Sequence, residues 1–223
     1  MAQGQPRGVF VTFEGGEGGG KSTQIKMLAE RLGQDDRDVV LTREPGGSLG
    51  AEILRHVILS GVGKMLGPET ETLLFAAARD DHVRSVIAPA LARGQWVLCD
   101  RFYDSTRAYQ GQLGKVDRAL MDSLQRVTIG ALKPDVTFIL DVPVEVGMRR
   151  ATARRGNAAP DRFEAETVAF HQGLRDAYQS IAKAEPERCV LIDADADADT
   201  VAASIWSALQ ARITTSMQNR KIA

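Results

Sequence analysis

A glycine-rich stretch near the N-terminus, FEGGEGGGKST, combines residue types that could hold phosphate. Within it, Gly15, Gly20, Lys21 and Ser22 have the spacing G-x-x-x-x-G-K-S. Glycines let backbone N–H groups turn inward around phosphate oxygens, the lysine can reach the β and γ phosphates, and the serine hydroxyl can bind Mg²⁺. The stretch follows an apolar run and begins a helical pattern, which is the context that this motif requires. It therefore predicts a nucleoside triphosphate site.

A second acidic residue is predicted to belong to the same site. The apolar run WVLCD ends in Asp100. Beside a phosphate-binding loop, a carboxylate at the end of a neighbouring strand is expected near the metal ion. We therefore predict that Ser22 and Asp100 act on Mg²⁺, with Asp100 binding it directly or through water. Many strands end in aspartate, so this prediction depends on the phosphate-binding motif.

The segment that follows, DRFYDSTRAYQG, could bind a second substrate. Arg101 lies at a strand tip, where a guanidinium could clamp a phosphate with two hydrogen bonds. Within the next two helical turns, hydroxyls and an amide come from Ser105, Thr106, Tyr109 and Gln110. Such a cluster suits a polar base or a sugar, although an ordinary capped helix would carry the same residue types.

An aromatic residue and an arginine lie four residues apart in another predicted helix. Phe75 and Arg79 therefore share one helix face. Together they could stack on a base and donate hydrogen bonds to it. Taken alone, a helical phenylalanine more often packs in the core, and an arginine is more often solvated.

Alternating strands and helices are predicted to position these residues. Five apolar runs are expected to be strands, at 9–13, 39–42, 96–100, 136–141 and 189–193. Helical spacing occurs at 24–32, 49–59, 69–92, 117–131, 164–183 and 200–212. Because buried parallel strands are apolar on both faces, the pattern predicts an α/β fold with a five-stranded parallel sheet flanked by helices on both faces. Ligands then bind beyond the carboxyl ends of the strands.

No linker divides the chain, so residues 1–213 are predicted to form a single domain and 214–223 a frayed tail. Residues 152–160 are rich in Arg, Ala, Gly and Asn, which predicts a mobile loop. The acidic run DADADADT lacks the glycine turn and distal glutamate of a calcium loop. We expect it to cap the last helix instead.

Composition narrows the class of protein. The 223 residues include 28 Lys+Arg and 29 Asp+Glu, so the formal net charge of -1 predicts no general attraction to nucleic acid or membrane. We expect no membrane span and no signal peptide, because no apolar run is long enough for the first or suitably placed for the second. Cys99 and Cys189 lie in apolar runs and are expected to be buried and reduced. A cytoplasmic protein is predicted.

Six motifs follow one another along the chain: FEGGEGGGKST, TREPGG, LLFAAARDDHV, DRFYDSTRAYQG, KPDVTFILDV and DRFE. In this order they resemble bacterial thymidylate kinases, across roughly residues 9–192. TREPGG together with DR-x-x-x-S-T-x-A-Y-Q is far more specific than the phosphate-binding motif alone. The resemblance implies a P-loop kinase fold with a mobile lid and transfer of a phosphoryl group from ATP to dTMP, giving dTDP. It also implies Mg²⁺ and a homodimer.

The same resemblance implies roles for individual residues. ATP would be bound by Gly15, Gly16, Glu17, Gly18, Gly19, Gly20, Lys21, Ser22, Thr23 and Arg150. The dTMP phosphate would meet Arg43 and Arg101, and thymine would meet Phe75 and Arg79. The nucleoside would be ordered by Pro45, Ser105, Thr106, Tyr109 and Gln110. Tyr109 would also exclude a ribose 2′-hydroxyl.

Glu17 is an anion inside a phosphate-binding loop, and its neighbour Gly18 stands where some thymidylate kinases carry a catalytic arginine. The resemblance implies that Glu17 meets the dTMP 3′-hydroxyl and the phosphate-binding arginines. Catalytic arginines would then come from the lid, at about residues 149–162, which contains Arg149, Arg150, Arg154, Arg155 and Arg162. The predicted catalytic residues are Lys21, Arg101, Glu17, Arg154 and Arg155.

Three alternatives remain open at this point. Another small nucleotide or deoxynucleoside kinase would differ in its acceptor. A P-loop ATPase switch would hydrolyse ATP without a small acceptor, but it explains neither the arginine-rich lid nor DRFYDSTRAYQG, and no Asn-Lys-x-Asp motif is present for a GTP-binding switch. A non-catalytic nucleotide-binding module is disfavoured because Lys21, Ser22 and Asp100 are all present.

Overall fold

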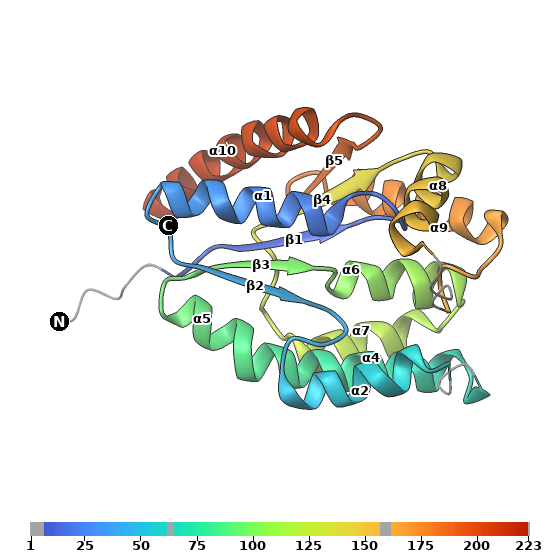
Figure 1. The fold of residues 1–223 in the computed structure, drawn as a ribbon. Coiled ribbons are helices and arrows are strands. Elements are labelled where there is room, and N and C mark those ends of the chain that lie inside the picture. Colours follow the sequence, from blue (N-terminus) through green and yellow to red (C-terminus); the bar gives the residue numbers. More distant parts are fainter. Residues whose placement is uncertain (1–6, 62–64, 157–161, 223) are drawn as a thin grey trace.

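The computed structural model describes residues 7–61, 65–156 and 162–222, the last nine of these as backbone only. Its centre is one sheet of five parallel strands in the order β2-β3-β1-β4-β5 (Figure 1). The strands are β1 (Phe10–Glu14), β2 (Val39–Arg43), β3 (Trp96–Asp100), β4 (Val136–Asp141) and β5 (Cys189–Asp193). The predicted five-stranded parallel sheet is confirmed.

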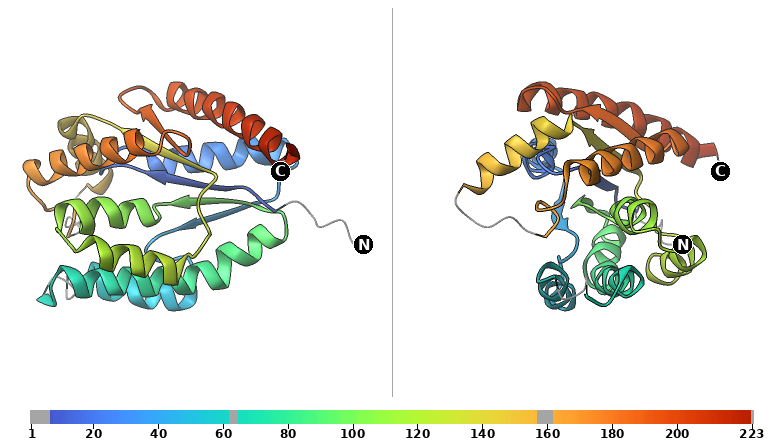
Figure 2. Two further views of the ribbon diagram at one scale, coloured as in Figure 1. Left: turned by 180° about the vertical axis from the view of Figure 1, so that it is seen from behind. Right: turned by 90° about the vertical axis from the view of Figure 1, so that its right-hand side faces the viewer.

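Helices cover both faces of the sheet. In chain order they are α1 (Lys21–Gln34), α2 (Leu49–Leu59), α4 (Pro68–His82), α5 (Ala88–Ala92), α6 (Tyr103–Thr106), α7 (Arg118–Thr128), α8 (Val144–Arg155), α9 (Val168–Ala184) and α10 (Ala198–Ile222). Two π-helical segments, η1 (Val83–Ile87) and η2 (Arg107–Leu113), continue α4 and α6. The views in Figures 1 and 2 show α1 and α10 on one face, with α4, α5 and α7 on the other.

The central strand β1 explains why the sheet must be covered twice. Its side chains alternate between faces, so Val11 and Phe13 pack with α1 and α10, whereas Phe10 packs with η1 and α5. Phe10, Val11 and Phe13 are all fully buried. A strand that is apolar on both faces can be stable only between two helical layers. The carboxyl ends of β1 and β3 then lie side by side, because Phe13 pairs with Asp100.

The structure corrects the predicted loop at 152–160. Helix α8 includes residues 152–155 and ends at Arg155, because the next residue, Gly156, has a φ of 59° that breaks the helix. Arginine and alanine are good helix formers, and this propensity outweighs the loop-like composition. Residues 157–160 of the predicted loop lie outside the described residues. The backbone of α10 is helical to Ile222, and the fraying of the tail stays a prediction.

The structure also bears on three smaller predictions, which concern the cysteines, the acidic run and membrane-spanning helices. Cys99 and Cys189 are buried free cysteines, as predicted. The acidic run caps α10, since Asp197 accepts hydrogen bonds from the Thr200 backbone N–H at 2.9 Å and from its hydroxyl at 2.6 Å. Among the described residues, none of the helices combines the length and the apolar composition needed to cross a membrane.

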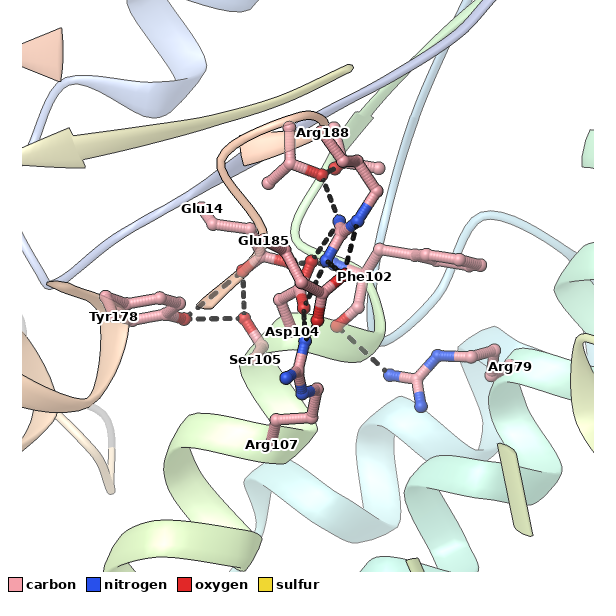
Figure 3. A network of polar contacts seen from close by, with 11 residues as sticks. Glu14, Arg79, Phe102, Asp104, Ser105, Arg107, Tyr178, Glu185 and Arg188 are labelled. Carbon is pink, nitrogen blue, oxygen red and sulfur yellow. Dashed lines mark hydrogen bonds and ion pairs between the residues drawn. The ribbon is translucent and has the colours of Figure 1, made fainter. Parts of the chain in front are cut away.

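A buried ionic network fastens α6 to the sheet at the edge where β3 ends (Figure 3). Asp104 is fully buried and accepts hydrogen bonds from Arg188 at 2.7 and 3.1 Å and from Arg107 at 2.8 Å. Arg188 precedes β5 and also donates to Thr137 in β4 at 2.6 Å. Glu185 accepts from both arginines. Because α6 begins the segment that carries the predicted acceptor residues, the network ties that segment to the rigid sheet.

Candidate active site

A cavity of about 430 Å³ lies beyond the carboxyl ends of β1 and β3. It is lined by most of the predicted site residues, namely Glu17, Gly18, Gly19, Gly20, Lys21, Ser22, Thr23, Arg43, Pro45, Phe75, Arg79, Asp100, Arg101, Ser105, Thr106, Tyr109, Gln110 and Arg154. The predicted residues Gly15, Gly16, Arg150 and Arg155 do not line it. The fold therefore brings the phosphate-binding loop and the predicted acceptor residues into one cavity.

Lys21 is the first residue of α1 and its side chain turns back into the loop. Its ammonium group donates to the carbonyl oxygens of Gly15 at 3.1 Å and Gly16 at 2.8 Å. Burial lowers its pKa, and the nearby Arg101 guanidinium lowers it further, while Glu17 opposes both. The loop thus holds a cation at the helix N-terminus, where phosphate oxygens would bind.

Ser22 and Asp100 come together at the rim of the loop. The Ser22 hydroxyl donates to Asp100 Oδ2 at 2.9 Å. A hydroxyl and a carboxylate are hard oxygen ligands of the kind that Mg²⁺ prefers. The donor set therefore fits the ion that was predicted for these two residues.

Arg101 connects the loop to the acceptor segment. Its Nη2 donates to Glu17 Oε1 at 2.6 Å, and its Nη1 donates to the Gly15 carbonyl and the Tyr178 hydroxyl, both at 3.1 Å, and to Ser105 Oγ at 3.3 Å. Its φ of 66° is unusual for a residue other than glycine, and such backbone strain is concentrated at functional sites. The strained turn at the end of β3 directs this guanidinium back over β1.

Glu17 is held as an anion by its surroundings. Burial alone would raise its pKa, but the charges of Arg101, Lys21 and Arg154 hold the pKa at about 2. The Tyr109 hydroxyl also lies 3.5 Å from Glu17 Oε1. The carboxylate is therefore paired with Arg101 and lies near the charges of Lys21 and Arg154, which explains how an anion is tolerated in a phosphate-binding loop.

Arg79 is buried on the opposite wall and fixed from two sides. Its Nε donates to Glu44 at 2.7 Å, and its Nη2 donates to Thr106 Oγ1 at 2.9 Å and to the Phe102 carbonyl at 3.3 Å. Its other terminal nitrogen, Nη1, makes no hydrogen bond within the part of the chain that the structure describes. Glu44 also pairs with His82 at 3.0 Å. The guanidinium is thus locked in place with one donor group left for a ligand.

The arginines of the predicted lid take different positions. Arg154 and Arg155 share one carboxylate, Glu164, at 2.8 and 2.9 Å. Of these two, Arg154 reaches the cavity. Arg162 pairs with Glu71 instead. The described structure therefore places a single lid arginine beside the phosphate-binding loop.

Arg149 and Arg150 lie nearer the start of α8. Arg150 donates to the carbonyl oxygens of Ala194 at 2.7 Å and Ala196 at 3.4 Å, in the loop after β5. Arg149 is exposed. Arg150 therefore borders the loop between β5 and α10, and its predicted contact with ATP is untested by this geometry.

Comparisons with known proteins show the family of this chain. A family model described as "Thymidylate kinase" matches residues 13–205. The chain is 67% identical over 217 residues to a thymidylate kinase of Bradyrhizobium sp. (strain ORS 278), which covers 97% of this chain and 96% of that protein. It is 66% identical to a thymidylate kinase of Nitrobacter winogradskyi, over 96% of both chains. This chain belongs to the thymidylate kinase family.

A solved structure supports the same family and the same fold. The crystal structure of thymidylate kinase from Ehrlichia chaffeensis is 35% identical and superposes with a TM-score of 0.74. The match covers 92% of this chain and 100% of that one. The resemblance predicted from the motifs is thereby confirmed, as are the P-loop kinase fold and the assignment of this chain as a kinase.

Several residues of the site in this thymidylate kinase family member were not predicted from the sequence. Glu14 and Glu44 belong to recognised motifs, so the sequence placed them near the site but did not indicate that they are buried. Phe163 packs edge-on against Tyr109, with ring centroids 5.1 Å apart, and lines the cavity. Tyr178 comes from α9 and contacts Arg101 only through the fold. No local pattern could have indicated that last contact.

Two glycines explain why this member of the thymidylate kinase family has no arginine in its phosphate-binding loop. A Cβ atom at Gly18 would lie 1.9 Å from the carbonyl oxygen of Gly147 in α8. A Cβ atom at Gly147 would in turn lie 2.5 Å from the carbonyl oxygen of Glu17. The two backbones are in contact, so position 18 has no room for a side chain. An arginine that contacts the transferred phosphoryl group could therefore not come from position 18.

We predict that Gly147→Ala lowers the free energy of unfolding by about 1–3 kcal/mol, because its new methyl group cannot fit against the loop backbone. It should also raise the KM for ATP, since α8 and the phosphate-binding loop must separate. Gly33→Ala is the matched control, because a Cβ atom there meets nothing within 4 Å. Stability is measured by urea unfolding and activity by steady-state kinetics. Equal stability and activity of the two variants would show that the contact between Gly147 and the phosphate-binding loop is unimportant.

Proposed function

We propose that this chain transfers the γ-phosphoryl group of ATP to dTMP, giving dTDP. The observation that carries this proposal is the single cavity in which the phosphate-binding loop faces Arg101, Phe75 and Arg79. A donor site and an acceptor site that share one wall allow direct transfer between two bound nucleotides. Family membership supports the same acceptor.

Each wall of the acceptor half has chemistry suited to one part of dTMP. Phe75 offers a ring for stacking on thymine, and Nη1 of Arg79 offers a donor group to the base. Arg101, together with Arg43, offers cationic groups for the phosphate. Tyr109 lies beside Glu17, where its ring would exclude a ribose 2′-hydroxyl.

Charge compensation and positioning are the main demands of this reaction. The acceptor is a phosphate oxygen that is already ionised, so no strong general base is needed. Lys21 compensates the β and γ phosphates of ATP, and Arg101 holds the acceptor phosphate against its repulsion. Ser22 and Asp100 would hold Mg²⁺, which would neutralise part of the triphosphate charge.

Arg154 is proposed as the catalytic arginine, and Arg155 as a support. Both bind Glu164, but their side chains are 62% and 20% exposed, and Arg154 is the one that lines the cavity. An arginine that reaches transferring phosphate can contribute a factor of about 10³–10⁵ to the rate. Arg155 would keep Glu164, and with it Arg154, in place.

We also propose that the enzyme is a homodimer. Exposed apolar side chains support this proposal, namely Leu49 and Ile53 on α2 and Leu73 on α4. A second copy of the chain would remove them from water. Sedimentation as a monomer at micromolar concentration would contradict it.

An acceptor assay tests the proposed reaction. ADP release should depend on dTMP and should be slower with dUMP, dCMP, UMP, AMP or thymidine as the acceptor. Lys21→Ala should lose transfer by orders of magnitude but keep dTMP binding, because the lysine meets only the triphosphate. ADP release without any acceptor would favour the ATPase alternative, and a faster rate with another acceptor would favour a different nucleotide kinase.

A matched pair of variants tests the assignment of the arginines. Arg154→Ala should lower kcat about 10³-fold or more with little change in the KM for dTMP. Arg155→Ala should lower kcat far less, by about tenfold, because it only loosens the support of Glu164. The larger loss in Arg155→Ala would reverse the two roles.

A further inference from the structure

Glu14 has no part in the chemistry described so far, although it lies beside the phosphate-binding loop. It ends β1 and is fully buried. Its Oε1 accepts the backbone N–H of Phe102 at 2.8 Å. Its Oε2 accepts Ser105 Oγ at 2.6 Å and the Tyr178 hydroxyl at 3.2 Å (Figure 3). The buried Glu14 carboxylate thus accepts three hydrogen bonds, and its Oε2 holds the Ser105 and Tyr178 hydroxyls close together.

The same two hydroxyls support Arg101. Nη1 of Arg101 donates to the Tyr178 hydroxyl at 3.1 Å and to Ser105 Oγ at 3.3 Å. The two hydroxyl oxygens are 2.8 Å apart. Glu14 therefore contacts Arg101 through two intermediate groups that come from different helices, α6 and α9.

Counting protons shows why an acceptor is needed at Oε2. A guanidinium can only donate, and each hydroxyl has a single proton. Nη1 of Arg101 has two protons for three acceptors, the Gly15 carbonyl and the two hydroxyls, so the hydroxyls accept and their own protons must point elsewhere. Only one of these hydroxyl protons can be donated to the other hydroxyl. Among the described residues, Oε2 of Glu14 is the remaining acceptor within hydrogen-bond distance for the second one.

We propose that Glu14 is a positioning residue for phosphorylation of dTMP, which acts by accepting hydrogen bonds at Oε2 and so orients Ser105 and Tyr178 to hold Nη1 of Arg101. Nη2 of Arg101 is then left to face Glu17 and the acceptor phosphate. This inference rests on the proposed role of Arg101. It assigns to a buried strand-end carboxylate the task of directing a substrate-binding arginine.

Protonation of Glu14 would have the same effect as removing the acceptor. Burial and the charge of Asp104 raise its pKa to about 7, while Ser105, Arg101 and the Phe102 N–H oppose the shift. The ionisable groups that interact with it within the described residues are Lys21, Cys99, Arg101, Asp104, Tyr109 and Tyr178. A proton on Oε2 makes it a donor. Support of Arg101 should therefore be present above pH 7 and weaken as the pH falls through 7.

Glu14→Gln tests the proposal with almost no change in shape. The Phe102 N–H still needs an acceptor, so the amide oxygen takes the place of Oε1 and the NH₂ group takes the place of Oε2. The NH₂ group then donates to both hydroxyls, and one hydroxyl proton is forced toward Arg101. At pH 8 we expect the affinity for dTMP to fall about tenfold or more, whereas thymidine, which lacks the phosphate, keeps its affinity within about twofold.

The measured quantity is the ratio of the dTMP and thymidine dissociation constants, from calorimetry. Asp104→Asn is the matched control, since it neutralises another fully buried carboxylate that binds Arg188 and Arg107 and not Arg101. It should lower the melting temperature and leave the ratio unchanged. Equal ratios in Glu14→Gln and the wild type would overturn the proposal, and so would an equal change of the ratio in Asp104→Asn.

Arg101→Lys separates this inference from the proposed function. If Arg101 binds the phosphate, Arg101→Lys weakens the preference for dTMP over thymidine, measured as the ratio of their dissociation constants. Adding Glu14→Gln to Arg101→Lys then weakens this preference little further. A full additional loss would overturn the role of Glu14. An unchanged preference in Arg101→Lys would instead overturn the role of Arg101, on which the proposal depends.

The wild type gives an independent result if Glu14→Gln does not fold. The preference of the wild-type enzyme for dTMP over thymidine should weaken as the pH is lowered from 8 to 6. The phosphate of dTMP itself titrates near pH 6, so a second series with the double variant Ser105→Ala and Tyr178→Phe provides the reference. An identical pH dependence in both proteins would contradict the proposal, because the double variant lacks both hydroxyls that Glu14 orients.

Discussion

The ion pair between Glu17 and Arg101 is the contact on which the rest of the site depends. It joins the phosphate-binding loop to the acceptor segment at 2.6 Å, between two side chains that are each 16% exposed. A nucleotide kinase must bring two polyanions together, and their repulsion must be offset by fixed cations. Here the anion of the loop holds a cation at the boundary between the two halves of the cavity. The residues predicted for the donor and for the acceptor are therefore joined by one pair of side chains.

The fold supplies the geometry of this pair. Strands β1 and β3 are neighbours, so the loop after one and the strained turn after the other meet at the same edge of the sheet. Two buried carboxylates hold the neighbouring segments, since Glu14 supports the turn through the hydroxyls near Arg101 and Asp104 fastens α6 through Arg188. Breaking a buried pair leaves an uncompensated charge, which is why such contacts hold a segment in one position. The contact of Gly18 with Gly147 brings α8 against the same loop.

The sequence alone was sufficient for the features that depend on local pattern. Apolar runs predicted all five strands to within a residue at either end, and glycine spacing predicted the phosphate-binding loop. Most residues predicted for the acceptor site from their motifs and from the resemblance to a family line the cavity. Features that depend on tertiary contacts were not predictable in this way. Tyr178 approaches Arg101 from α9, and the burial that raises the pKa of Glu14 arises only when α6 covers the end of β1.

The most direct test of this account is the effect of Glu17→Gln on the two substrates separately. The carboxylate orients Arg101 and faces the acceptor, so kcat/KM for dTMP should fall at least about tenfold while the dissociation constant for ATP changes less than about twofold. Steady-state kinetics and ATP binding by calorimetry would measure both. An equal loss for both substrates, or a loss for ATP alone, would contradict the claim that Glu17 joins the two sites through Arg101.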